Sequence, residues 1–151
     1  VDLLWCAMGV QTNNLAKRMA REYLSELREA QTAVHKDLGN AKLPTKRPKE
    51  GNVAAWDAKV ANLLTTKLSR VEVPKGNGLD VEFASCRAST MEELENFITS
   101  LETKLQTMGD DGQLLNLRLQ NALQQKQQRI EMQATASKVR HDANMGVIRK
   151  I

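Results

Sequence analysis

The residue types that most often carry catalysis or metal binding are few in this chain and widely separated. His35 and His141 are its two histidines, and Cys6 and Cys86 are its two cysteines, with no Cys-x-x-Cys pair. A zinc site needs several cysteines or histidines at short, fixed spacings, and this chain offers none. No phosphate-binding loop and no serine-hydrolase, zinc-protease or EF-hand motif occurs. The sequence therefore predicts a protein that is not an enzyme and that has no catalytic residue, no metal site and no cofactor.

The densest group of acidic side chains has a structural explanation. Glu92, Glu93 and Glu95 follow Ser89 and Thr90. A serine or threonine followed three residues later by a glutamate is the capping-box pattern of a helix start, and carboxylates are favoured near the positive end of the helix dipole. These residues therefore indicate the beginning of a helix and not a metal site.

The stretch that dominates the chain is Gln113–Ile151, which contains no proline and a single glycine, Gly146. Small or apolar residues recur in it at steps of three and four, which predicts a helix packed along one side. At 1.5 Å per residue this helix would be about 55 Å long, longer than a domain of this size. It must therefore bend, project or pair with another long helix. The stripe consists of Leu115, Leu119, Leu123, Ile130, Ala134, Ser137 and Ile148.

A second long helix is expected over Leu4–Leu38, ending near Gly39. Its apolar residues also follow steps of three and four, close to a heptad seam. We therefore expect the two terminal helices to pair as an antiparallel coiled coil, with Tyr23 and Leu27 buried against Leu119–Ile130. The predicted coiled-coil residues are Met19, Tyr23, Leu27, Val34, Leu115, Leu119, Leu123 and Ile130.

The middle of the chain is predicted to be a small, mixed insertion. Ala41–Asn52 is basic and interrupted by prolines, and we expect a solvated loop that lacks an apolar anchor. Val53–Arg70 has the pattern of an amphipathic helix. In Val71–Ala84 apolar and polar residues alternate around a glycine-containing turn, which predicts a β-hairpin. Ser89–Gly112 predicts another helix, which we expect to end at Gly109–Gly112.

The predicted fold class is therefore mainly α, with a helix and β-hairpin insertion between two long terminal helices. The predicted boundaries are residues 1–38 for the N-terminal coiled-coil helix, 39–88 for the variable, outward-facing insertion, and 89–151 for the acidic helix and the long C-terminal helix.

Charge is distributed unevenly along the chain, whose formal net charge is +4. Ser89–Gly112 carries one basic and six acidic residues, whereas Gln113–Ile151 carries seven basic and two acidic residues. Consecutive segments of opposite sign favour neighbours in an assembly or an antiparallel pair over a uniformly basic nucleic-acid surface. No apolar run reaches the length of a membrane span, and the short apolar Val1–Val10 is expected to be a buried helix start. We therefore expect no nucleic acid and no membrane span.

The last residues of the sequence suggest contacts with other copies of the chain. Helix ends fray unless something holds them, and successive residues point around a helix, so a two-helix core cannot cover four neighbouring apolar side chains. Burial against neighbouring copies would yield an open helical polymer. The predicted self-assembly residues are Met145, Val147, Ile148 and Ile151, and the charges expected to meet a neighbouring copy or to line a lumen are Lys138, Arg140, Arg149 and Lys150.

Three stretches give the chain a resemblance to a known family. They are Met91–Leu105 followed by Gly112–Asn121, the glutamine-rich run that ends at Met145–Ile151, and Leu3–Gln31. Together they resemble the extracellular needle-tip and translocator-filament proteins of bacterial type III secretion systems, including the EspA-like filament subunits. The resemblance implies a secreted, extracellular structural protein of a bacterial surface appendage, which polymerises helically into a hollow conduit. It also implies the needle subunit, the translocator proteins and a secretion chaperone as partners.

Two other functions remain open at this point. The chain could be an intracellular helical adaptor or chaperone that buries its C-terminal stripe in a different protein. It could also be a basic nucleic-acid-binding helical protein, which would use Lys42–Lys49 and the basic last helix.

Overall fold

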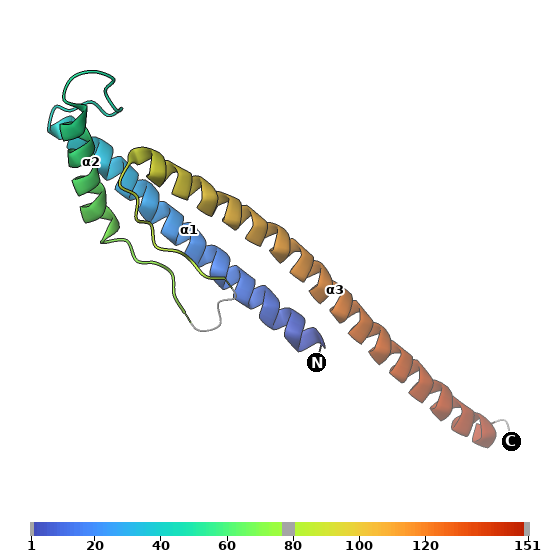
Figure 1. The fold of residues 1–151 in the computed structure, drawn as a ribbon. Coiled ribbons are helices and arrows are strands. Elements are labelled where there is room, and N and C mark those ends of the chain that lie inside the picture. The colour runs from blue at the N-terminus through green and yellow to red at the C-terminus, as the bar shows by residue number, and fades with distance from the viewer. Residues whose placement is uncertain (1, 77–80, 150–151) are drawn as a thin grey trace. The chain divides into compact units, whose positions relative to one another are not determined.

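The computed structural model describes the backbone of residues 2–76 and 81–149 and the side chains of residues 3–76 and 81–132. Three α-helices, α1 (Asp2–Asn40), α2 (Val53–Leu68) and α3 (Met91–Arg149), make up most of this described part (Figure 1). The mainly helical fold class is therefore as predicted, and α1 and α2 lie within two residues of their expected bounds.

The chain divides into two compact units. We call Thr12–Gly112 the core unit, and we call Val1–Gln11 together with Gln113–Ile151 the terminal unit. The predicted insertion, residues 39–88, thus belongs to the same unit as most of α1 and the beginning of α3.

The core unit is built around one buried stripe on each helix. On α1 the buried side chains recur at steps of three and four, the spacing that keeps residues on one side of a helix. α2 buries one residue per turn, and Lys67 of α2 pairs with Asp37 of α1 at 3.2 Å. The main core residues are Tyr23, Leu27, Val34 and Leu38 of α1, Trp56, Val60, Leu64 and Leu68 of α2, and Leu94, Ile98 and Leu101 of α3.

Within the core unit, α1 and α3 run in opposite directions. The amide Nδ2 of Asn13 donates a hydrogen bond to the carbonyl oxygen of Met108 at 3.0 Å. Further along α1, Nε2 of Gln31 donates to the carboxylate of Glu95 at 2.6 Å. Residue numbers that rise along α1 therefore meet numbers that fall along α3.

The expected register between the terminal helices is wrong. The Tyr23 ring packs edge-on against Phe97, with 6.0 Å between the ring centroids, and against Phe83 at 6.4 Å. Tyr23 therefore contacts the first turns of α3 and not Leu119–Ile130. Periodicity defines the side of each helix that is buried, but it leaves the register open. The α3 residues that occupy the core are Leu94, Ile98 and Leu101, all in its first turns.

The predicted β-hairpin is not found, because the described residues on either side of 77–80 form no strand. Val71 and Val73 pack instead against the core. Backbone carbonyls that a ladder would use accept hydrogen bonds from helix side chains: Ala84 from the Tyr23 hydroxyl at 2.7 Å, and Glu82 from the Lys104 ammonium. The expected turn at residues 77–80 lies outside the described part of the chain.

The prediction that a helix ends at Gly109–Gly112 is also wrong, because α3 includes all four residues. Glycine in a helix interior costs about 1 kcal/mol relative to alanine, which tertiary packing can outweigh. Gly112 is buried against α1, and a Cβ atom there would lie 2.5 Å from Oδ1 of Asn13. Close packing of α1 on α3 therefore accounts for a helical glycine at this position.

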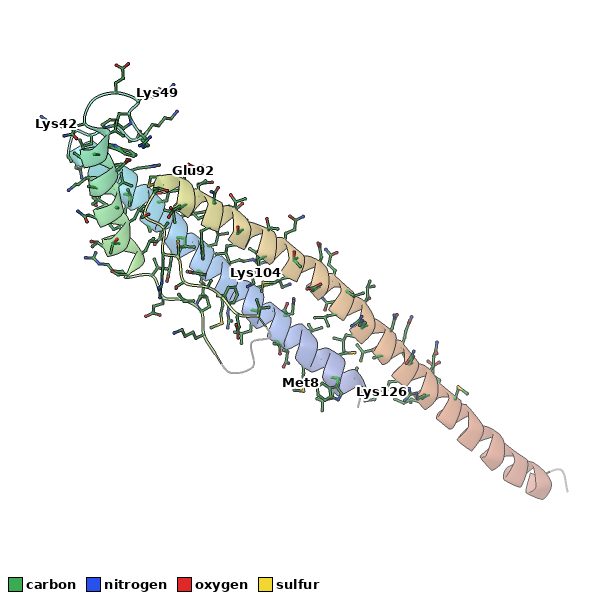
Figure 2. All side chains as sticks on the ribbon, in the orientation of Figure 1. Met8, Lys42, Lys49, Glu92, Lys104 and Lys126 are labelled. Carbon is green, nitrogen blue, oxygen red and sulfur yellow. The ribbon has the colours of Figure 1, made fainter. Side chains whose placement is uncertain are left out.

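The loop between α1 and α2 is attached to the core unit, contrary to the expectation that it lacks an apolar anchor. Leu43 packs against the core, and Nε1 of Trp56 donates a hydrogen bond to the carbonyl oxygen of Pro44 at 2.8 Å. The basic side chains Lys42 and Lys49 project outward from this loop (Figure 2).

Candidate functional site

The α1 residues predicted for the coiled coil lie in the core unit. Tyr23, Leu27 and Val34 are at most 2% exposed, and Met19 is half-buried. These side chains hold the core unit together and leave little surface for a partner.

The α3 residues of the same prediction lie in the terminal unit and differ among themselves. Leu115 and Leu119 are half-buried, and a Cβ atom at Gly9 would lie 3.3 Å from Cδ2 of Leu115, so α1 and α3 also approach closely in this unit. Leu123 and Ile130 are 48% and 54% exposed. The structure therefore places Leu115 close to α1 and leaves much of Leu123 and Ile130 uncovered.

Buried and exposed apolar side chains are segregated between the two units. Among the residues whose side chains are described, every fully buried hydrophobic residue belongs to the core unit, and every large exposed one belongs to the terminal unit. Single exposed apolar residues are ordinary, but a concentration of large ones in one unit makes that unit the candidate site of interaction. The exposed set is Leu4, Trp5, Met8, Leu114, Leu117, Leu123, Ile130 and Met132.

Sequence reasoning missed the α1 members of this set, because it took Val1–Val10 for a buried helix start. Trp5 and Met8 are 68% and 50% exposed. Met8 is out of phase with Gly9 and the buried Ala16 and Ala20, which lie at heptad-like steps along the seam, whereas Trp5 lies four residues before Gly9 and shares their phase. The phase of Met8 was therefore an available signal, but the spacing of Trp5 gave none.

The part of α3 in the terminal unit whose side chains are described, Gln113–Met132, carries more basic than acidic residues. Arg118, Lys126 and Arg129 are exposed, and Glu131 is the one acidic residue among Gln113–Met132.

The predicted self-assembly residues and the charges expected beside them fall in the last fourteen residues of the sequence. The α3 backbone is described as far as Arg149, so Lys150 and Ile151 lie outside the described residues. Side chains are described only as far as Met132, which leaves out those of Lys138, Arg140, Met145, Val147, Ile148 and Arg149.

Two groups that could act as nucleophiles, Tyr23 and Cys86, are held in their protonated forms. Burial raises the pKa of Tyr23 to about 12, and burial also raises the pKa of the Cys86 thiol. A thiol or phenol must lose its proton to be an effective nucleophile, so neither is activated at neutral pH. Within the described residues, no three side chains of histidine, cysteine, aspartate or glutamate are grouped closely enough to hold a metal ion.

A groove of about 900 Å³ opens in the core unit between α1, the loop that follows it, α2 and the start of α3. Trp56 and Val60 contribute apolar surface, and Arg47 crosses the rim to Asp57 with two hydrogen bonds of 3.0 Å. The hydrogen bonds from Arg47 hold the pKa of the Asp57 carboxyl below its usual range. Acidic Glu92 lies on the same rim, so the groove selects neither anions nor cations by charge.

No helix in the part of the chain that the structure describes combines the length and the apolar character needed to cross a membrane. Comparison with known proteins identifies no relative: no family model, no curated protein and no solved structure matches this chain.

Proposed function

We propose that this protein is a structural subunit that assembles with copies of itself through the terminal unit. The observation that carries the proposal is the segregation of apolar side chains, with the buried ones in the core unit and the large exposed ones in the terminal unit. A subunit of this kind needs a self-contained folded part and a separate part whose apolar surface is covered only in the assembly.

The exposed surface is large enough to matter energetically. Burying a large apolar side chain completely contributes about 1.5–3 kcal/mol, and roughly half of that remains available for a side chain that is half exposed. Trp5, Leu117 and Met132 are all more than half exposed. Several such residues on one small unit favour association when copies meet.

Two further features of this subunit are the way its long helices pair and the kind of assembly that it forms. We propose that α1 and α3 pair along their seams as an antiparallel coiled coil and that the assembly is a hollow, extracellular filament or tip of a bacterial type III secretion system. The opposite direction of α1 and α3 in the core unit supports the first part. The resemblance of the long helices to filament subunits motivates the second, with the needle subunit, the translocator proteins and a secretion chaperone as partners.

The C-terminal tail keeps its proposed role as a contact between copies. Met145, Val147, Ile148 and Ile151 would be buried against a neighbouring subunit, and the basic side chains near them would meet acidic residues of that neighbour or line the lumen. Deleting Gly146–Ile151 should then leave a folded chain that no longer polymerises, which circular dichroism and negative-stain microscopy would show. Normal polymers from the truncated chain would remove the tail from the assembly.

Sedimentation velocity on the purified chain tests self-assembly through the terminal unit. The wild type should sediment as larger species as its concentration rises, whereas the double variant Trp5→Ser, Met8→Ser should form smaller species at the same concentration, with unchanged thermal unfolding of the core unit. Arg70→Ser, a change at an exposed position of the core unit, serves as the control and should assemble as the wild type does. A double variant that assembles like the wild type would contradict the proposal.

An adaptor that binds a different protein would expose a similar surface. It would differ in staying monomeric on its own at every concentration, so the same sedimentation experiment separates the two functions.

A further inference from the structure

A second helical stripe runs along α3 in the terminal unit, away from the side that packs on α1. The half-buried residues Leu115, Leu119 and Ala122 recur at steps of four and three. One residue earlier a parallel series begins, with steps of three, four, three and four, and all of its members are exposed; the next step of three reaches the charged Glu131, where this uncharged series ends. Steps of this kind keep side chains on one side of a helix, as in a coiled-coil seam. The series, which we call the outer stripe, is Leu114, Leu117, Asn121, Gln124 and Gln128.

The outer stripe is nearly uncharged. Together with the positions that flank it, it comprises ten residues, of which one, Arg118, is charged. Charged residues make up 26% of the whole chain, so this side of α3 is poorer in charge than the average. The ten residues are Gln113, Leu114, Leu117, Arg118, Gln120, Asn121, Gln124, Gln125, Gln127 and Gln128.

This composition identifies the kind of partner that fits. An amide side chain carries both donors and an acceptor, so it can satisfy an identical amide opposite it. A purely apolar partner would leave the buried amides unpaired, at about 1–3 kcal/mol for each unsatisfied group. A partner selected by charge would find little to recognise here. An identical stripe meets neither problem, because its leucines match leucines, its amides match amides and few like charges face each other.

We propose that the outer stripe is covered by the outer stripe of a second copy, with the two α3 helices parallel and in register. This inference rests on the proposed self-assembly and names the contact through which it begins. In the parallel arrangement Leu114 meets Leu114 and Asn121 meets Asn121. An antiparallel arrangement centred on Asn121 would place Leu114 opposite Gln128, which buries an amide against a leucine. A polar residue in such a seam fixes the register of the pair.

A parallel pair of this kind has two-fold symmetry, so it uses the same surface on both copies and closes after two. Growth beyond a pair therefore requires a different surface, which leaves the proposed role of the C-terminal tail intact.

Two leucines of α3 provide a matched test by substitution. Leu117 belongs to the outer stripe and is 56% exposed, while Leu123 is 48% exposed and lies on another side of the same helix. Glutamine favours helix and adds no charge, so either replacement preserves α3. Leu117→Gln should raise the concentration at which pairs form by about tenfold or more, since apolar burial is lost on both copies. Leu123→Gln should change it much less.

Disulfide trapping tests the direction of the pair. Gln128→Cys should form a disulfide between the two substituted positions under mild oxidation, because in-register parallel helices place identical positions of the outer stripe side by side, and a disulfide needs Cβ atoms about 3.5–4.5 Å apart. Leu123→Cys serves as the control and should not form this bond. Peptide mass spectrometry distinguishes it from disulfides that involve Cys6 or Cys86, which are free in the structure.

The outcomes separate the inference from the proposed function. Weaker pairing of Leu117→Gln than of Leu123→Gln, together with the disulfide at position 128, supports the inference. If the wild type assembles but either of these results is missing, the parallel outer-stripe contact is wrong and self-assembly stands. If the wild type is monomeric at every concentration, both are wrong.

Discussion

Gly109 and Gly112 offer a matched pair of substitutions within one turn of α3. Both are helical, and alanine stabilises a helix interior by about 1 kcal/mol relative to glycine. A Cβ atom at Gly109 would meet nothing within 4 Å, so Gly109→Ala should raise the free energy of unfolding by about 0.5–1 kcal/mol. At Gly112 a Cβ atom would lie 2.5 Å from Oδ1 of Asn13 and 3.1 Å from Nζ of Lys17. The same alanine therefore cannot fit there without a shift of its neighbours.

Moving Asn13 has its own cost. Its Nδ2 donates a hydrogen bond to the carbonyl oxygen of Met108 at 3.0 Å, and its Oδ1 is buried with no partner among the described residues. Losing that hydrogen bond costs about 0.5–1.5 kcal/mol, and overpacking adds about 1–3 kcal/mol. The better helix propensity of alanine offsets about 1 kcal/mol of these two costs. Gly112→Ala should therefore lower the free energy of unfolding by about 0.5–3.5 kcal/mol.

Urea unfolding followed by circular dichroism at 222 nm measures these changes. The double variant Asn13→Ala, Gly112→Ala isolates the contact, because Gly112→Ala should lose its destabilising effect once the Asn13 side chain is absent. The reasoning is refuted if Gly112→Ala stabilises the protein as much as Gly109→Ala does, or if its effect is the same with and without Asn13.

Three further predictions concern the core unit. Leu27 is 0% exposed, so Leu27→Ala should cost about 2–5 kcal/mol, and an unchanged thermal melt would show that its burial is unimportant. Tyr23 is the one tyrosine of the chain and has its pKa raised to about 12, so absorbance at 295 nm should report ionisation well above pH 10. Because the native pKa of Tyr23 lies above the unfolded value of about 10, its contribution to stability is complete below about pH 10 and is lost as the pH rises toward 12. Tyr23→Phe should abolish this loss of stability. A tyrosine titration midpoint near pH 10 would contradict the burial of the hydroxyl. Replacing Lys46, Arg47 and Lys49 by serine should leave assembly intact, because these side chains are exposed on the loop after α1. If this variant no longer assembles in sedimentation velocity, the loop is part of an interface.

Helices whose signals are local could be predicted from the sequence. Val53–Arg70 was expected and Val53–Leu68 is helical, with Oδ1 of Asn52 accepting a hydrogen bond from the backbone N–H of Ala55 at 3.2 Å. The capping residues before α3 also behave as expected, since Oγ1 of Thr90 accepts a hydrogen bond from the backbone N–H of Glu93 at 3.1 Å. Both signals lie within four residues of the helix start, where local chemistry decides the structure.

Features that depend on distant residues could not be predicted in this way. α3 continues through Gly112 because α1 packs against it, and no local pattern near Gly112 contains that information. Likewise, Val71–Ala84 has the alternation of a hairpin, but Tyr23 and Lys104 bind its carbonyls from the helices. The predicted assembly residues in the tail lie outside the described side chains, and the exposed apolar set at Trp5 and Leu117 became apparent only from the burial of their neighbours.

Negative-stain electron microscopy of the purified chain alone, examined over a range of concentrations, tests most directly whether this protein builds an assembly from itself. Our account predicts elongated, regular polymers whose number rises with concentration and which disappear in the double variant Trp5→Ser, Met8→Ser. Uniform single particles of monomer size at the highest soluble concentration would contradict it.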